Sequence, residues 1–373
     1  MGRQAAERQP NRLTLKDYAL PALEGSHSRS HVEQDPCSWV HHRRVLLRPV
    51  PHIAKQTRRQ TLVVNRTIAP GIAVSPLALG TNVFGWTADT ETSHQVLDAY
   101  VQGGGNFLDT ADSYSFWAEG NTGGESETII GKWLAGRSDR DDLVIATKVS
   151  HHPQFAGMAP ETIRAAIDAS LTRLDIDAVD IYYAHFDDPT TPLVESIAAM
   201  SELVDLGKIR SIGISNYTAE RIKEWLDITI REGFHQPVVV EPQYNLVERG
   251  IEADILPLAR THGLAVVPYY SLAHGFLTGK YDDGEEIASP RAPDAAKYLN
   301  AHGRKVIDAV KSVAERHSTQ PASISLAWLA AQNGVAAPIA SARTTDQLPP
   351  LVESMQIQLS TKDLQLLDEA SQL

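Results

Sequence analysis

The chain has 373 residues, of which 42% are hydrophobic and 21% charged, enough for one large domain or two ordinary ones. The formal net charge of −12 disfavours nucleic acid or an anionic membrane as the main partner. A single cysteine, Cys37, excludes an intrachain disulfide, and no run of residues is apolar and long enough to span a bilayer or to form the core of a secretory signal. These features predict a cytoplasmic protein.

The first 60 residues differ from the rest of the chain. They show no sustained periodicity, carry five prolines among Ser, His and Arg, and are net positive although the whole chain is acidic. This composition predicts a disordered or loosely attached extension, followed by a folded domain at residues 61–373. Two alternatives stay open: a basic arm that binds a partner, and a translation start further along the chain.

From residue 61 onward, short apolar runs alternate with amphipathic patterns of period 3.6. A hairpin is predicted at residues 61–65 and 72–74, around the turn Pro70-Gly71. Strands are then predicted at residues 75–80, 106–109, 143–148, 179–185, 208–215, 238–242, 264–270 and 335–340. Helices are predicted at residues 91–102, 125–134, 160–173, 192–206, 218–231, 251–262, 304–316, 321–332, 345–354 and 361–370.

Eight strands that alternate with helices predict an α/β fold, specifically a (β/α)8 barrel of the TIM type. The hairpin would close the bottom of this barrel. The stretch at residues 271–303, after the seventh strand, is longer than an ordinary loop, so we expect it to be functional.

Three consecutive predicted strands end in ionisable residues. The second ends at Asp109, with Tyr114 five residues later, the third ends at Lys148, and the fourth at His185. Taken singly, each has an ordinary structural interpretation: Asp109 and Tyr114 as an Asx turn with a half-buried Tyr, Lys148 as a solvated residue at a strand end, and His185 as a hydrogen-bonded residue of the core. Taken together, they lie at the C-terminal face of parallel strands, where α/β folds carry their chemistry.

These four side chains suit the reduction of a carbonyl group. A phenol with a pKa of about 10 can donate a proton at neutral pH, and a neighbouring ammonium stabilises the phenolate that remains. Tyr114 would therefore act as general acid, Lys148 and Asp109 as the pair that tunes it, and neutral His185 as the group that orients the substrate oxygen.

With these four residues, the sequence resembles the aldo-keto reductases. Asp109, Tyr114, Lys148 and His185 match the family in order and in strand position. Further matching motifs are Ser215-Asn216-Tyr217, Pro242-Gln243-Tyr244-Asn245-Leu246 and the run from Leu272 to Tyr281. The resemblance extends from about residue 61 to residue 354 and is to the branch that includes bacterial reductases and the β-subunits of potassium channels.

The resemblance implies NADPH as the cofactor, bound at the barrel mouth. A reductase needs a hydride source, and no Rossmann fingerprint is present, because Gly103-Gly104-Gly105 precedes a strand. The positions implied to bind the cofactor are Thr81, Ser215, Asn216, Gln243, Tyr269, Ser271, Leu272, Gly275, Lys280, Ser341, Arg343 and Gln347. The chain departs from the family at Pro350-Leu351, where an acidic residue and Asn are usual, and at Tyr270-Ser271-Leu272, where Ser-Pro-Leu is usual.

The expected substrate is a small aldehyde or ketone. Aromatic residues expected at the mouth are Trp86, Phe116, Trp117 and Phe186, and they suit an apolar ring or a sugar ring equally. Two alternatives remain: a reductase of nucleotide-linked keto-sugars, and a regulatory protein like the channel β-subunits. The latter carry Asn where His185 stands, which favours the enzyme.

No metal site is predicted. His41-His42 and His151-His152 are adjacent pairs without carboxylates at ligand spacing, so we interpret them as surface histidines.

Overall fold

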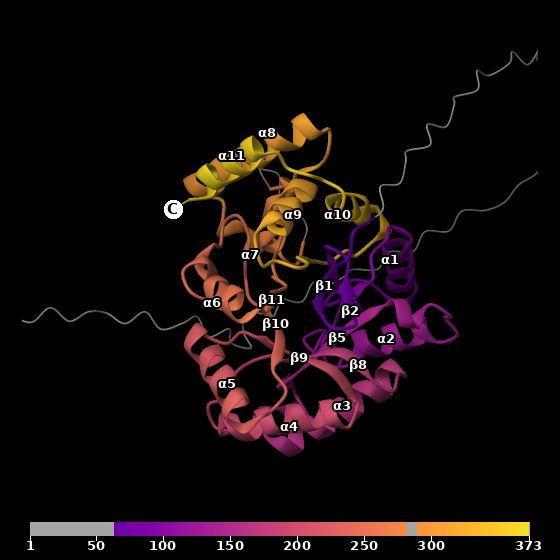
Figure 1. The fold of residues 1–373 in the computed structure, drawn as a ribbon. Helices are drawn as coiled ribbons and strands as arrows, with labels where there is room; N and C mark the ends of the chain where they lie inside the picture. Colours follow the sequence, from indigo (N-terminus) through magenta and orange to yellow (C-terminus); the bar gives the residue numbers. More distant parts are fainter. Residues whose placement is uncertain (1–62, 282–288, 373) are drawn as a thin grey trace, which may run out of the picture. The chain divides into compact units, whose positions relative to one another are not determined.

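The centre of the structure is a sheet of eight parallel strands surrounded by helices (Figure 1). The computed structural model describes residues 63–281 and 289–372, so the predicted extension at residues 1–60 lies outside the described residues. The strands, in their order across the sheet, are β11 (Ala265–Val266), β10 (Pro237–Glu241), β9 (Ile209–Ser215), β8 (Val179–Ala184), β5 (Val144–Val149), β4 (Phe107–Asp109), β3 (Ala78–Gly80) and β12 (Ile339–Ala340).

The two edges of this sheet meet, so the sheet is a closed barrel. Ala336 N donates to Val266 O at 2.8 Å, which joins the segment leading into β12 to β11. On the other side of the same segment, Ala78 N donates to Pro338 O at 2.9 Å, which joins it to β3. Each strand is thus hydrogen-bonded on both sides, and the predicted (β/α)8 barrel is confirmed.

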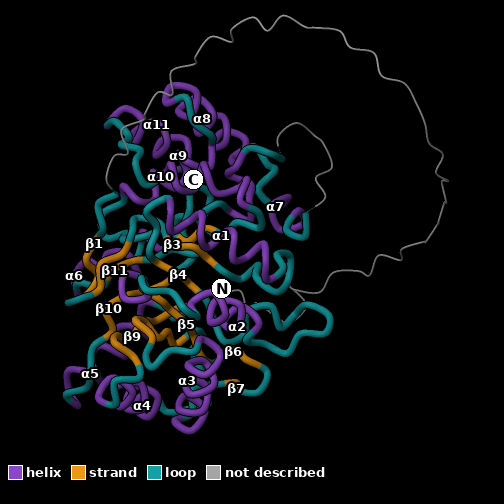
Figure 2. The backbone as a smooth tube through the Cα atoms, turned by 90° about the vertical axis from the view of Figure 1, so that its right-hand side faces the viewer, coloured by secondary structure: helices purple, strands orange, loops and turns teal. Residues whose placement is uncertain are grey.

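Helices follow the strands and enclose them, as the view turned by 90° also shows (Figure 2). None of the helices in residues 63–281 and 289–372 is both long and apolar enough to cross a membrane. The helices are α1 (Thr90–Gln102), α2 (Glu125–Leu134), α3 (Pro160–Leu174), α4 (Leu193–Asp205), α5 (Ala219–Glu232), α6 (Ile255–His262), the short α7 (Ala292–Ala296), α8 (Ala301–His317), α9 (Pro321–Ala331), α10 (Leu348–Ser354) and α11 (Thr361–Ser371).

Two hydrophobic layers hold the barrel together, because successive residues of a strand face opposite sides. Outward residues such as Leu108, Ile145 and Ile214 are buried against the helices. Inward residues such as Phe107 and Ile181 fill the barrel interior. Burying each such side chain contributes about 1.5–3 kcal/mol, so the two layers dominate the stability of the fold.

The two strands of the N-terminal hairpin directly flank its turn, and the predicted position of the first strand was wrong. The strands are β1 (Arg66–Ala69) and β2 (Ile72–Val74), whereas residues 61–65 were predicted for the first. The predicted turn at Pro70-Gly71 is confirmed; Gly71 has φ 76°, and so tight a turn requires pairing to begin at the residues that flank it. The Arg66 guanidinium donates to Val335 O and Ala336 O, at 2.8 and 3.1 Å, which fastens the hairpin to the barrel.

Three barrel strands are shorter than predicted by three residues or more, and proline explains the difference. The predictions were residues 75–80, 264–270 and 335–340, whereas β3, β11 and β12 have 3, 2 and 2 residues. Pro76, Pro268 and Pro338 stand within or beside the lost portions. A proline has no N–H to donate to its neighbour, so the ladder is interrupted there.

Two further segments depart from the predictions. A small hairpin, β6 (His151–His152) and β7 (Phe155–Ala156), follows β5 and was not predicted, since two-residue strands leave no periodic signal. The predicted irregular stretch 271–303 contains the 3-10 helix η4 (Ala273–Thr278) and α7, and its residues 282–288 lie outside the described residues.

The contact between α2 and α3 can be tested with Gly131→Ala. A Cβ at Gly131 would lie 2.2 Å from Arg173 O, so the helices must separate. Alanine in an open helix position would instead stabilise by about 0.5–1 kcal/mol. We expect Gly131→Ala to lower the free energy of unfolding in urea by about 1–3 kcal/mol. Gly250→Ala, with open space around the new methyl group, is the matched control, and equal behaviour of the two variants would contradict the close contact.

Candidate active site

The barrel interior changes from apolar to polar at the C-terminal ends of four strands. Asp109, Lys148, His185 and Glu241 each stand two residues after an inward-facing side chain of the interior layer, so their side chains face the same way. All four are buried. The sequence predicted the first three, and the structure brings them together with Tyr114, which follows β4.

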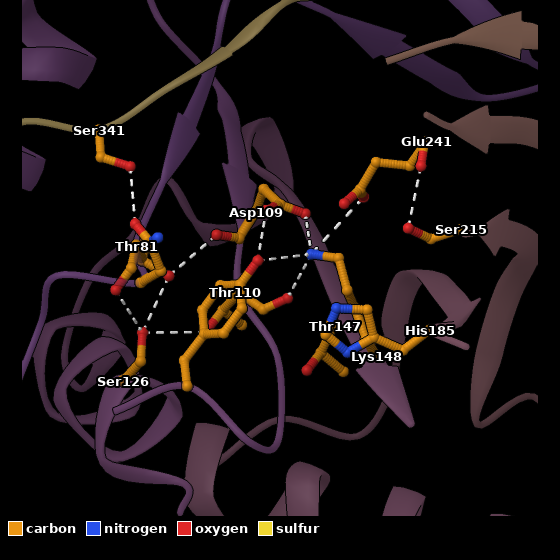
Figure 3. Close-up of polar contacts among 12 residues, drawn as sticks. Thr81, Asp109, Thr110, Ser126, Thr147, Lys148, His185, Ser215, Glu241 and Ser341 are labelled. Carbon is orange, nitrogen blue, oxygen red and sulfur yellow. Dashed lines mark hydrogen bonds and ion pairs between the residues drawn. The ribbon is translucent and has the colours of Figure 1, made fainter. Parts of the chain in front are cut away.

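The Lys148 ammonium is the centre of the site (Figure 3). Its Nζ donates to Asp109 Oδ1, to Thr110 O at 2.9 Å and to the Tyr114 hydroxyl at 3.2 Å. Glu241 Oε2 lies 3.5 Å away. The Tyr114 hydroxyl in turn donates to Asp109 Oδ2 at 3.3 Å. A phenol, an ammonium and a carboxylate thus form a closed triangle, as the proposed acid chemistry requires.

The electrostatics of the site follow from burial. Desolvation raises the pKa of the Asp109 carboxyl, although Lys148 and the hydrogen bond from Tyr114 act in the opposite direction. Burial, reinforced by Lys148 and by His151, holds the pKa of His185 well below its usual range. His185 is therefore neutral at physiological pH, and a neutral imidazole can donate one hydrogen bond to a substrate oxygen.

Five rings line the mouth beside these groups. Centroid distances are 5.7 Å for Trp86 and Trp117, 5.5 Å for Trp117 and Phe116, 5.9 Å for Phe116 and His151, and 4.8 Å for His151 and Phe186. The four residues predicted to meet substrate are therefore neighbours, and His151 completes the row. These half-buried rings form an aromatic wall next to Tyr114, whose ring lies 6.4 Å from that of Trp117.

The interpretation of the pair His151-His152 as surface histidines was wrong. His152 is only 3% exposed, and its Nδ1 accepts from Gln154 N at 3.0 Å. The His151 ring lies 6.2 Å from that of His185. The β6–β7 hairpin buries His152 and places the half-buried His151 ring beside His185 and Phe186, and that hairpin carried no signal in the sequence.

The residues expected around the nicotinamide lie together, at the end of β9 or just after β9, β10 and β11. Ser215 Oγ donates to Glu241 O at 2.9 Å, and Asn216 Nδ2 donates to Ser215 Oγ at 3.0 Å. The Tyr269 hydroxyl donates to Asn216 Oδ1 at 2.7 Å, and Gln243 pairs with Tyr269 through the backbone. These contacts hold the Tyr269 ring in one orientation at the mouth.

Thr81 contributes a buried hydroxyl instead of an exposed one. Its Oγ1 donates to Asp109 O at 2.9 Å and accepts from Ser126 Oγ at 2.9 Å (Figure 3). Thr81 thereby holds the backbone of Asp109, whose carboxylate contacts Lys148 and Tyr114.

The remaining expected cofactor residues form two groups. In the segment after β11, Ser271 Oγ donates to Pro268 O at 2.9 Å, Leu272 is half-buried, and Gly275 lies beside exposed Lys280. After β12, Ser341 Oγ donates to Asn82 Oδ1 at 2.8 Å, and Arg343 N donates to Gln347 Oε1 at 2.9 Å. The second group is next to β3 because β12 pairs with β3.

Glu241 is a buried ionisable residue beside Lys148 that sequence reasoning missed. The sixth strand was predicted to run to residue 242, with Gln243 as the functional residue at its end, whereas β10 ends at Glu241. The missed signal is period two: Glu241 stands two residues after the inward Val239, as Lys148 stands two after Ala146.

A profile of the Aldo/keto reductase family matches residues 76–372, which is most of the chain. The chain belongs to the aldo/keto reductase family. This aldo/keto reductase is therefore an NAD(P)H-dependent oxidoreductase, as expected from Asp109, Tyr114, Lys148 and His185.

Similar proteins span the branch predicted for this aldo/keto reductase. Protein tas of Escherichia coli (strain K12) is 31% identical over 317 residues, which cover 78% of this chain and 92% of that protein. A probable voltage-gated potassium channel subunit beta of Oryza sativa subsp. japonica is 32% identical over 298 residues, 76% of this chain and 88% of that one. An aryl-alcohol dehydrogenase (NADP(+)) of Phanerodontia chrysosporium is 29% identical over 337 residues, which cover 82% of this chain and 85% of that protein.

The loop that carries Phe186 is held by Asp188, which makes a prediction about acid stability. Burial alone would raise its pKa, but hydrogen bonds from Thr190, Met158 and Thr191 lower it to about 2. Because the folded pKa is below the unfolded value of about 3.9, this stabilisation is present above pH 4 and is lost as the pH falls towards 2.

At pH 6, we expect Asp188→Asn to lower the free energy of unfolding in urea by about 1 kcal/mol. This is the usual contribution of a hydrogen bond to a charged group that is partly screened by solvent. The difference should shrink as the pH is lowered from 4 towards 2. Asp227→Asn, at an exposed site on α5, is the control. A difference that stays constant with pH would show that Asp188 is not held as a carboxylate.

Proposed function

We propose that the protein reduces an aldehyde or ketone to an alcohol, with NADPH as the reductant and Tyr114 as the general acid. The observation that carries this proposal is the position of the Lys148 ammonium, which contacts both the Tyr114 hydroxyl and Asp109. A phenol is a weak acid, and the adjacent cation stabilises the phenolate left after proton donation.

Each of the four side chains has a separate role in the proposed reduction. Tyr114 donates its proton to the carbonyl oxygen, and Lys148 balances the negative charge that remains on the phenolate. Asp109 holds Lys148 in place by a direct ion pair. Neutral His185 donates a hydrogen bond that orients the carbonyl, and the aromatic wall excludes water from the reacting groups.

The donor set at the mouth fits a dinucleotide cofactor. When bound, NADPH supplies the hydride that the side chains cannot. The half-buried Tyr269 ring offers a stacking surface, and Ser215, Asn216 and Gln243 offer groups for an amide. Lys280 and Arg343 offer positive charge for phosphates. The relative from Phanerodontia chrysosporium is named an aryl-alcohol dehydrogenase (NADP(+)), which supports the phosphorylated cofactor.

An aromatic aldehyde or ketone fits the mouth best. The row of five rings, with Trp86 at one end and Phe186 at the other, presents ring faces and edges, which favour a flat aromatic substrate. A nucleotide-linked keto-sugar is the second candidate, because His151 adds a polar atom to the same wall. A purely regulatory role like that of a channel subunit is disfavoured by the complete set of proton-donating and orienting residues.

The acid role is tested by Tyr114→Phe, which removes the proton donor and little volume. General acid catalysis contributes about 10²–10⁴-fold, so kcat with 4-nitrobenzaldehyde and NADPH should fall by about that factor. NADPH binding, followed by protein fluorescence quenching, should change little. The control is Tyr182→Phe on the outer face of β8, which should keep nearly full activity. Activity of Tyr114→Phe within about threefold of the unsubstituted protein would refute Tyr114 as the acid.

The cofactor preference is tested by Arg343→Ala. If the guanidinium binds the 2′-phosphate, the variant should bind NADPH more weakly by about tenfold or more while NADH changes little, since a hydrogen bond to a charge contributes about 1.5–3 kcal/mol. Both dissociation constants are measured by fluorescence quenching. Arg231→Ala, on the exposed face of α5, is the matched control. Equal weakening of both cofactors would show that the 2′-phosphate is bound elsewhere or not at all.

A further inference from the structure

Glu241 is a buried carboxyl group beside the catalytic ammonium that the proposed chemistry does not use. It is the last residue of β10 and is 3% exposed. Its Oε2 lies 3.5 Å from Lys148 Nζ, yet this oxygen has no hydrogen-bond partner among the described residues. Its backbone oxygen accepts from Ser215 Oγ at 2.9 Å, so the strand end is held in place.

The charges around Lys148 do not balance if every group is ionised. Asp109 and Glu241 would contribute two negative charges against the one positive charge of Lys148, all in the barrel interior. Unpaired buried charge is costly, so one proton should be retained by the two carboxyls. Asp109 accepts from both Lys148 and Tyr114, which favours its ionised form, whereas Glu241 Oε2 accepts from no group in the described part of the chain.

The groups that face Glu241 agree with this assignment of the proton. They are Asp109 from β4, Lys148 from β5 and Tyr183 from β8. Burial and then Asp109 raise the pKa of Glu241 well above its usual value, and Lys148 only partly offsets them. Burial, with Glu241 and Asp109, also raises the pKa of Tyr183 well above its usual value, so Tyr183 stays neutral and supplies no compensating charge.

We propose that Glu241 is a positioning residue for the reduction: it retains a proton that keeps the Asp109–Lys148–Tyr114 group electrically balanced, and loss of that proton weakens Tyr114 as a proton donor. The physical reason is that a negative charge 3.5 Å from Lys148 Nζ offsets the field of the ammonium at the phenol. The phenolate left after proton donation is then less stabilised. This inference rests on the proposed function, because it needs Tyr114 to be the acid.

The consequence is an alkaline limit on turnover that Glu241 imposes. Below the pH at which Glu241 titrates, its carboxyl is neutral and resembles the amide of glutamine. Above it, the unsubstituted enzyme carries the extra negative charge and its kcat falls. Glu241→Gln keeps the shape of the side chain but cannot lose the proton, so its kcat should persist to higher pH.

The test is the pH profile of kcat and of KM for 4-nitrobenzaldehyde with saturating NADPH, in the unsubstituted enzyme and Glu241→Gln. At neutral pH we expect the kcat of Glu241→Gln to be within about threefold of that of the unsubstituted enzyme. The alkaline limb of the profile, where kcat falls as the pH rises, should lie about one pH unit higher in the variant, which corresponds to about a tenfold difference in kcat at a fixed alkaline pH. Glu248→Gln, on the segment after β10 with its carboxylate bonded to Tyr298, is the matched control and should keep the original limb. A limb that does not move, or a tenfold loss of kcat at neutral pH, would overturn the proposal.

An infrared measurement tests the proton without relying on catalysis. The spectrum of the unsubstituted protein minus that of Glu241→Gln should contain the carbonyl stretch of a protonated carboxylic acid at neutral pH, and this band should vanish on alkalinisation. Its absence at neutral pH would refute the retained proton even if the enzyme reduces carbonyls. If instead Tyr114→Phe stays fully active while the band is present, the proposed function fails and the assignment of the proton to Glu241 stands.

Discussion

A buried ammonium group is the constraint on which the site depends. Lys148 is fully buried on an inner strand of the barrel, and an isolated charge in such a place would cost several kcal/mol. The structure meets this cost with the Asp109 carboxylate, the Thr110 carbonyl and the Tyr114 hydroxyl, each of which accepts a hydrogen bond from Nζ. Two of these groups, the Asp109 carboxylate and the Tyr114 hydroxyl, also belong to the proposed chemistry, so the burial of Lys148 and that chemistry require the same geometry.

The outer face of the same strand is fixed by a separate set of contacts. Thr147, next to Lys148, donates to Glu127 Oε1 at 2.5 Å, and Glu127 Oε2 forms an ion pair with Arg173 at 2.7 Å. Glu127 belongs to α2 and Arg173 to α3. The strand that carries Lys148 is thus tied to two helices on its outer face, which fixes the backbone from which Lys148 projects.

Much of the architecture could be predicted because it depends on long periodic patterns. α2 was predicted with its observed limits, and Asp109, Lys148 and His185 were predicted from their positions at the ends of three consecutive apolar runs. The sequence could not show where a proline would interrupt pairing between distant segments, as Pro268 and Pro338 do. Glu241 was overlooked because the sixth strand was predicted to run to residue 242, which drew attention to Gln243 and away from the inward position two residues after Val239. His151 was overlooked because a two-residue strand has no period to detect.

The row of aromatic rings has a consequence for how this enzyme could diversify. Its members come from separate connections: Trp86 after β3, Phe116 and Trp117 after β4, His151 on the β6–β7 hairpin, and Phe186 after β8. The ionised groups, in contrast, belong to strands of the closed barrel. Exchange of Trp86 or Phe186 would therefore change the shape and polarity offered to a substrate without replacing any partner of Lys148. Phe116 and Trp117 share their connection with Tyr114, so that connection is the one on which a change of substrate specificity and the hydrogen bonds of Lys148 are linked.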